Sequence, residues 1–128
     1  HYLLQTRDAG EVRLVKAARG DLVLVPPGFG HVTINPGRET LSMANIVSTR
    51  FESDYTSYER LHGAAYFEVE GGKLVKNPNY PRAAEVRISE ARDQGALRFL
   101  PAGPLYGLVG TGSLGFLNHP EEYPDLFS

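Results

Sequence analysis

Residues 20–35 constrain the fold more than any other part of this 128-residue chain, because an apolar run meets a corner of proline and glycine there. Residues 22–25 are apolar and rich in valine, which predicts a short buried strand. Pro26 and Pro27 have no N–H to donate to a sheet ladder, so that strand must end at the corner. The chain then returns on a second strand, which carries His31 on the same face as small polar residues. A histidine in this position suits a metal ligand or a proton carrier.

Turn-forming residues divide the first part of the chain into short strands. Gly28 and Gly30 are expected to let the backbone of the corner turn tightly. Alternating polar and apolar residues predict two hairpins, at residues 2–16 and 65–77. The Gly-Gly pair at 71–72 supplies the positive φ angles that the second hairpin turn needs.

The segment 40–47 also alternates, and both of its faces are apolar or small, which predicts a strand buried on both sides. A buried Asn45 amide in this strand would need a hydrogen-bond partner. A short helix is expected around residues 58–61, with Asp54 as its cap. Several short strands without a long helix predict an all-β sandwich or barrel over residues 1–77.

The strand pattern weakens over residues 78–128. Two more short strands are predicted at 85–89 and 113–118, separated by an irregular stretch rich in proline and glycine. A helix is expected to begin at Pro120, where two glutamates follow the proline. The segment has too few apolar residues for a domain of its own. We therefore expect a mixed C-terminal extension that packs on the first part of the chain or on a partner subunit.

The composition restricts the classes of function. The formal net charge is −2, and the Lys and Arg residues are scattered, which argues against a nucleic-acid partner. The sequence has no apolar stretch of membrane-spanning length and no signal-peptide pattern, which favours the cytoplasm over a membrane. It also lacks cysteine, so neither disulfides nor thiolate metal sites are expected. The chain begins at His1 and enters an apolar run at once, so we expect an upstream part to be missing.

Five residues of the opening stretch match the second signature of the cupin superfamily. That signature is Gly, five residues, Pro, one residue, Gly, two residues, His, three residues and Asn. Every spacing is met here, by Gly20, Pro26, Gly28, His31 and Asn35. The resemblance implies an antiparallel double-stranded β-helix, or jelly-roll barrel, of which this chain would contain a part.

Within the cupins, the chain resembles the archaeal-type glucose-6-phosphate isomerases. The resemblance rests on residues 2–6, 25–27, 31–35, 53–55 and 76–78. It implies a metal-dependent enzyme of glycolysis and gluconeogenesis that interconverts glucose 6-phosphate and fructose 6-phosphate through a cis-enediol. It also implies a homodimer, and a partial barrel would leave sheet edges that a second subunit could cover.

By this resemblance, His31 is one of four ligands to a divalent metal ion such as iron, manganese, nickel or zinc. The other three ligands belong to the first cupin signature, a His-x-His pair followed by Glu, which is expected upstream of this chain. One histidine cannot hold a transition metal, because such sites need three or four ligands. The metal site would therefore be completed by residues outside this sequence.

The resemblance also indicates candidate reacting groups. Better-known members carry a Tyr and a His for proton transfer, and Val47 and Ser53 stand at those places here. Asp54 and Tyr55 do match the family, and they are the candidate catalytic residues. Thr33 is the candidate substrate-binding residue on the face of His31. Each has a structural alternative: Asp54 as a helix cap, Tyr55 as a packing residue and Thr33 as a strand former.

Three functions are compatible with the sequence. The first is the isomerisation of glucose 6-phosphate, a small phosphosugar. The second is the isomerisation of another sugar. The third is a non-catalytic cupin that binds a sugar or a metal, in which the replaced Tyr and His mark the loss of chemistry.

Overall fold

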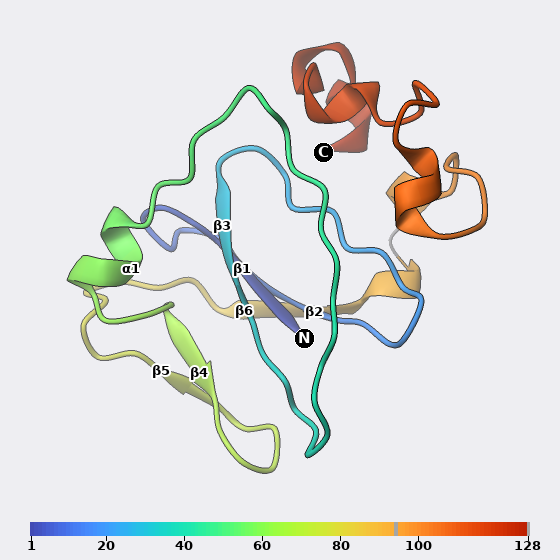
Figure 1. The fold of residues 1–128 in the computed structure, drawn as a ribbon. Helices are drawn as coiled ribbons and strands as arrows, with labels where there is room; N and C mark the ends of the chain where they lie inside the picture. The colour runs from blue at the N-terminus through green and yellow to red at the C-terminus, as the bar shows by residue number, and fades with distance from the viewer. Residues whose placement is uncertain (94, 128) are drawn as a thin grey trace. The chain divides into compact units, whose positions relative to one another are not determined.

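The computed structural model describes residues 1–93 and 95–127, and the chain divides into two compact units. Unit 1 comprises His1–Leu41 and Asp54–Asp93, and unit 2 comprises Ser42–Ser53 and Gln94–Ser128. All of the described strands lie in unit 1, whereas unit 2 contains short 3₁₀ helices (Figure 1).

Unit 1 is built on a four-stranded sheet and a separate two-stranded hairpin (Figure 1). Its elements are β1 (Tyr2–Thr6), β2 (Val12–Lys16), β3 (Phe29–Thr33), α1 (Thr56–Arg60), β4 (Tyr66–Glu68), β5 (Leu74–Lys76), β6 (Val86–Glu90) and the 3₁₀ helix η1 (Ala91–Asp93). The sheet order is β3-β1-β2-β6, in which β1 is antiparallel to both of its neighbours and β6 is parallel to β2. The strand-rich unit agrees with an all-β class, but the parallel pairing of β6 departs from the antiparallel sheet that was predicted.

Local sequence explains the two hairpins, which the strand pattern predicted correctly. At the turn between β1 and β2, Asp8 Oδ1 accepts hydrogen bonds from Thr6 Oγ1 at 2.9 Å and from the Gly10 N–H at 3.0 Å. At the turn between β4 and β5, Gly71 and Gly72 have φ angles of 87° and 81°. Residues with a Cβ rarely adopt this left-handed region, so the glycine pair determines where the second hairpin turns.

Two apolar clusters lie on opposite faces of the sheet. Leu3 and Leu14 face one side and pack with Tyr80, beneath the β4–β5 hairpin and α1. Leu4 and Val15 face the other side, because successive side chains of a strand point in opposite directions. β1 is therefore buried on both faces and forms the centre of unit 1.

A buried polar side chain joins β1 to the segment before β4. Gln5 Nε2 donates to Tyr80 Oη at 3.0 Å, and Gln5 Oε1 accepts the N–H of Ala65 at 2.8 Å. Tyr80 Oη in turn donates to the carbonyl of Gly63 at 3.0 Å. This chain of hydrogen bonds ties the sheet to the connection between α1 and β4.

The structure corrects two strands of the sequence analysis. Neither residues 22–25 nor residues 40–47 pair with a strand among the described residues. The segment 40–47 is also exposed rather than buried; Leu41, Met43 and Val47 are 48%, 48% and 60% exposed. The alternation predicted strand conformation, but a strand also needs a neighbour whose N–H and C=O groups it can pair with.

Among the described residues, the buried asparagine is Asn77, whereas Asn45 is exposed. Asn77 Nδ2 donates to the carbonyls of Leu61 at 3.0 Å and Ala64 at 2.9 Å. These bonds tie the residue that follows β5 to the segment at the end of α1. The buried Asn45 that the sequence predicted is wrong, because its segment is exposed.

Unit 2 packs around the buried ring of Phe116. The ring centroids of Phe99, Tyr123 and Phe127 lie 5.6, 6.4 and 6.5 Å from that of Phe116. The strand predicted at 113–118 is wrong, because the chain forms a 3₁₀ helix there and satisfies its backbone locally. The helices of this unit are η2 (Gly95–Leu97), η3 (Leu105–Leu108), η4 (Gly115–Leu117), η5 (Pro120–Glu122) and η6 (Pro124–Leu126).

Candidate functional site

His31 and Thr33 lie on β3 and face the same side of the sheet. In the antiparallel register, His31 is opposite Leu4 and Thr33 is opposite Tyr2. The centroids of the His31 and Tyr2 rings are 6.3 Å apart. Although His31 is exposed, protein atoms around its ring remove part of the water and lower its pKa below the ordinary value of 6.5. The imidazole is therefore neutral at pH 7 and carries the lone pair that a metal ion requires.

The described residues do not complete a metal site around His31. Among the described residues, the His, Asp and Glu side chains that come close enough together to share a metal ion are His119, Glu121 and Glu122, all exposed, and His31 is not one of them. First-row metal ions need at least three protein ligands. His31 fits as one ligand in its position and protonation state, but the set that the described residues offer around it does not fit a complete centre.

The bend that precedes β3 and the turn that follows it are held as the sequence predicts, with one exception. Gly28 has a φ of 81° and makes the turn. Asn35 braces the far end of the strand: its Nδ2 donates to the Glu39 carbonyl at 2.7 Å, and its Oδ1 accepts the Gly37 N–H at 3.1 Å. Gly30, which was expected in the turn, lies within β3 instead.

Asp54 and Tyr55 stand together just before α1, and both are exposed. Asp54 Oδ1 accepts the N–H of Thr56 at 3.0 Å, and Asp54 Oδ2 lies 3.6 Å from Arg7 Nη2. Hydrogen bonds from the side chain and backbone of Thr56, assisted by the Arg7 guanidinium, hold the pKa of Asp54 below its usual range. The prediction that Asp54 caps the helix is wrong, because Tyr55 holds the N-cap position and has no capping side-chain bond; Asp54 precedes it, accepts the Thr56 N–H and is ionised at neutral pH.

The four predicted site residues form two pairs. His31 and Thr33 share one face of β3, and Asp54 adjoins Tyr55, whose side chain is 64% exposed at the N-cap position of α1. Among the described residues, no hydrogen bond or ion pair joins one pair directly to the other.

The sequence analysis missed a buried carboxylate. Glu68 on β4 is 5% exposed at its side chain, and both of its carboxylate oxygens lie 2.9 Å from His1 Nδ1. The backbone N of His1 also donates to the Ile34 carbonyl at 2.9 Å, which places His1 beside the end of β3. No local pattern could have revealed this pair, because His1 and Glu68 are 67 residues apart in the sequence.

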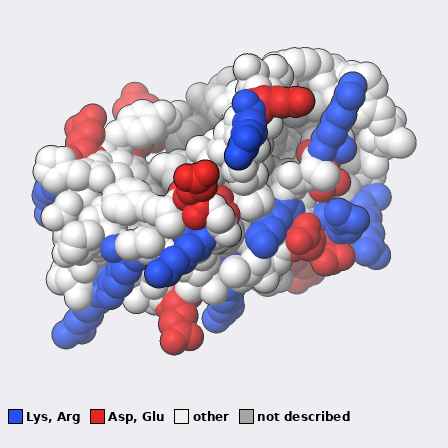
Figure 2. All heavy atoms as spheres, turned by 90° about the horizontal axis from the view of Figure 1, so that it is seen from below, with Lys and Arg blue, Asp and Glu red and all other residues white. Residues whose placement is uncertain are grey.

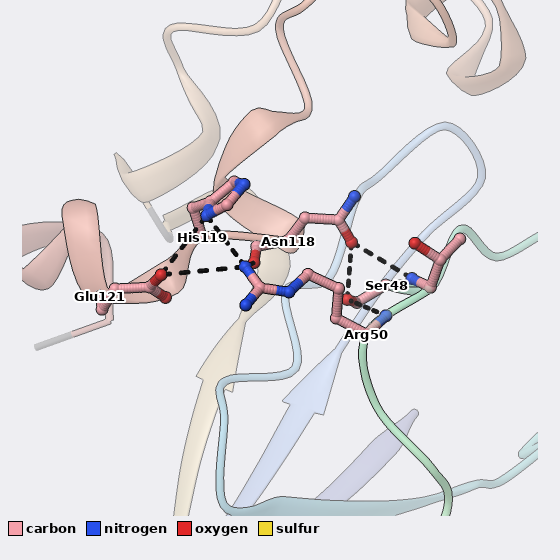
Figure 3. A network of polar contacts seen from close by, with 6 residues as sticks. Ser48, Arg50, Asn118, His119 and Glu121 are labelled. Atoms are coloured by element: carbon pink, nitrogen blue, oxygen red, sulfur yellow. Dashed lines mark hydrogen bonds and ion pairs between the residues drawn. The ribbon is translucent and has the colours of Figure 1, made fainter.

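A second polar network lies in unit 2 (Figure 3). Asn118 Oδ1 accepts the hydroxyl of Ser48 at 2.7 Å, and Arg50 Nη1 donates to the Asn118 carbonyl at 2.8 Å. Arg50 Nη1 also lies 3.0 Å from His119 Nδ1 and 4.0 Å from Glu121 (Figure 3). The guanidinium thus already occupies the place that a cation would take beside His119 and Glu121, so this network is a structural tie.

The charged side chains are mixed in sign. On the face shown in Figure 2, Lys and Arg lie among Asp and Glu rather than apart from them, in keeping with a net charge of −2. Within residues 1–93 and 95–127, none of the helices has the length and apolar character to cross a bilayer.

The comparison with protein families gives one match. The model of the family described as "Glucose-6-phosphate isomerase (GPI)" matches residues 1–85. The matched segment contains His31, Thr33, Asp54 and Tyr55. No curated protein and no solved structure matches the chain.

Proposed function

The chain belongs to the glucose-6-phosphate isomerase family, and from this premise we propose that the protein interconverts glucose 6-phosphate and fructose 6-phosphate. The observation that carries the proposal is the extent of the family match. It covers two thirds of the chain and includes both pairs of predicted site residues. We further propose that the sheet of unit 1 is part of a cupin barrel and that the working protein is a cytoplasmic homodimer.

The proposed reaction moves a proton from C2 of the sugar to C1 through a cis-enediol, while a hydroxyl proton passes from O2 to O1. Asp54 is ionised and can accept a proton, and the exposed phenol of Tyr55 can donate a hydrogen bond to a sugar oxygen. Thr33 would bind a sugar hydroxyl from the face of β3 that also carries His31. These roles divide proton transfer and sugar binding between the two pairs of residues.

We propose that His31 is one ligand of a divalent metal ion such as iron, manganese, nickel or zinc. The neutral imidazole supports this role. Because the described residues do not complete a centre around His31, the other ligands would come from residues outside these 128.

The test is turnover by the purified full-length protein, measured as fructose 6-phosphate formed before and after removal of metal with EDTA. We expect activity that EDTA abolishes and that added Mn²⁺ or Fe²⁺ restores. His31→Ala should lose both bound metal and activity. His62→Asn is the matched control, because His62 is an exposed histidine with a φ of 56°, a conformation that Asn tolerates.

Two outcomes would contradict the proposal. Full activity after chelation would refute the metal requirement. No turnover with any divalent ion would refute the isomerase and favour a non-catalytic sugar-binding protein, an alternative supported by Val47 and Ser53 at the places of the family's Tyr and His. That alternative predicts a rise in melting temperature with glucose 6-phosphate but no product.

A further inference from the structure

Tyr58 of α1 packs so closely against Gly30 of β3 that a larger residue at position 30 would displace its ring. A Cβ added to Gly30 would lie 2.5 Å from Tyr58 Oη, 2.8 Å from Cε2 and 3.1 Å from Cζ. The φ angle of Gly30 is not in the left-handed region. The close approach of the ring, and not the backbone conformation, is therefore what favours glycine here.

The hydroxyl of Tyr58 takes no part in hydrogen bonding. Its oxygen is buried and has no hydrogen-bond partner among the described residues. Burial, together with the neighbouring Tyr80, raises the pKa of Tyr58 to about 12, so the phenol stays protonated at neutral pH. A side chain with these properties acts through its shape and position rather than by carrying a proton.

The contact links the two pairs of site residues. Gly30 directly precedes His31, and Tyr58 lies one helical turn after Tyr55, whose carbonyl accepts the Glu59 N–H at 3.0 Å. A movement of the Tyr58 ring would therefore move the start of α1 relative to β3.

The other connection at the start of α1 is weaker. The ion pair between Arg7 and Asp54 spans 3.6 Å, and the two side chains are 75% and 54% exposed. Exposed pairs of this kind contribute little to stability. The buried contact between Tyr58 and Gly30 is thus the stronger constraint on the helix.

We propose that Tyr58 is a positioning residue, which sets the distance from Asp54 and Tyr55 to His31 and Thr33 by packing against Gly30. This inference rests on the proposed function for its effect on turnover, but the packing itself can be tested without turnover.

The first experiment compares the kinetics of three variants of the full-length protein with those of the wild type. Tyr58→Phe keeps the ring, and we expect kcat and KM to stay within about twofold of the wild type, whereas Tyr58→Ala should lower kcat by about tenfold or more with little change in KM. Tyr66→Ala is the matched control, because Tyr66 is a half-buried tyrosine packed against the same cluster but lies on β4 and not on α1. Equal losses of kcat in Tyr58→Ala and Tyr66→Ala would overturn the proposal.

The second experiment measures positioning without turnover, by hydrogen exchange at the Glu59 and Leu61 amides, which bond within α1. We expect faster exchange in Tyr58→Ala and exchange at the wild-type rate in Tyr66→Ala. Gly30→Ala should lower the melting temperature in the wild-type background and have little effect in the Tyr58→Ala background. Absence of turnover in the wild type would refute the proposed function and leave the packing to be tested by these two measurements. Unchanged hydrogen exchange in Tyr58→Ala, or additive effects of Gly30→Ala and Tyr58→Ala on the melting temperature, would refute the positioning role.

Discussion

Replacement of Gln5 by methionine tests the buried hydrogen bonds that join β1 to the segment before β4. The substitution keeps the length and approximate volume of the side chain, so the cavity it leaves is small. It leaves the N–H of Ala65 without its partner at 2.8 Å, and Ala65 is fully buried. An unpaired buried donor costs about 1–3 kcal/mol.

The loss of the hydrogen bond from Gln5 Nε2 to Tyr80 Oη adds a smaller free-energy cost. Tyr80 Oη loses the donor at 3.0 Å but keeps its own bond to the Gly63 carbonyl, so this loss costs about 0.5–1.5 kcal/mol. The greater hydrophobicity of methionine offsets about 1 kcal/mol. We therefore expect Gln5→Met to lower the free energy of unfolding by about 0.5–3.5 kcal/mol.

Urea unfolding followed by circular dichroism measures this change as a lower midpoint with an unchanged m value. Tyr80→Phe completes a double-mutant cycle, and we expect the two substitutions to be less than additive, because they remove the same hydrogen bond. A loss below about 0.5 kcal/mol for Gln5→Met, or full additivity, would refute the argument that this bond is buried and shared.

Three further predictions follow from individual groups. The NMR titration of His31 should have its midpoint below pH 6.5, and a midpoint at or above 6.5 would contradict the desolvation of the ring. Because the unfolded chain binds this proton more readily than the folded one, protonation of His31 should lower the free energy of unfolding as the pH falls through this range. The effect should be absent in His31→Gln. The Tyr58 phenol should ionise near pH 12 in the folded protein and near pH 10 in the unfolded chain, so the free energy of unfolding should fall as the pH rises above 10. Ultraviolet absorbance should show a late-titrating tyrosine that is absent in Tyr58→Phe. Asn77→Ala should lower the free energy of unfolding by about 2–4 kcal/mol, because the hydrogen bonds from its side chain to the carbonyls of Leu61 and Ala64 are lost. Asn79→Ala, at an exposed asparagine, should lower it by less than about 1 kcal/mol. Equal losses in urea unfolding would show that burial does not decide the difference.

The hairpins illustrate what local sequence can predict. Each depends on a turn whose residues adopt the required conformation themselves: Asp8 accepts hydrogen bonds within its own turn, and Gly71 and Gly72 adopt positive φ. The strands on either side are close in sequence, so their pairing needs no knowledge of the rest of the fold.

The segments 22–25 and 40–47 show why other strands could not be predicted. Their patterns are those of strands, yet no described strand pairs with them. An alternating pattern indicates which side chains could be buried on one face of a strand. The backbone hydrogen bonds of that strand, however, depend on whether another strand lies beside it in the fold. For the same reason, the parallel pairing of β6 with β2 was not foreseen.

The residues of the candidate site also differ in how they could be predicted. The spacing of the signature was enough to identify His31 and to place Thr33 on its face, because both follow from the two-residue period of one strand. The family resemblance added Asp54 and Tyr55. The sequence predicted Asp54 as the cap of α1, but the helix begins one residue later than that prediction requires, so Tyr55 holds the N-cap position and Asp54 accepts the Thr56 N–H from outside it.

By itself, then, the sequence determined the short-range features of this protein: its hairpins, the corner before β3, the face on which His31 lies and the family to which the chain belongs. Only the tertiary structure decided which strands found partners, which carboxylate and amides were buried, and that the Tyr58 ring lies against Gly30. The physical reason is that turn conformation and side-chain alternation are properties of neighbouring residues. Burial, strand pairing and close packing depend instead on residues that are far apart in the sequence and meet only when the chain folds.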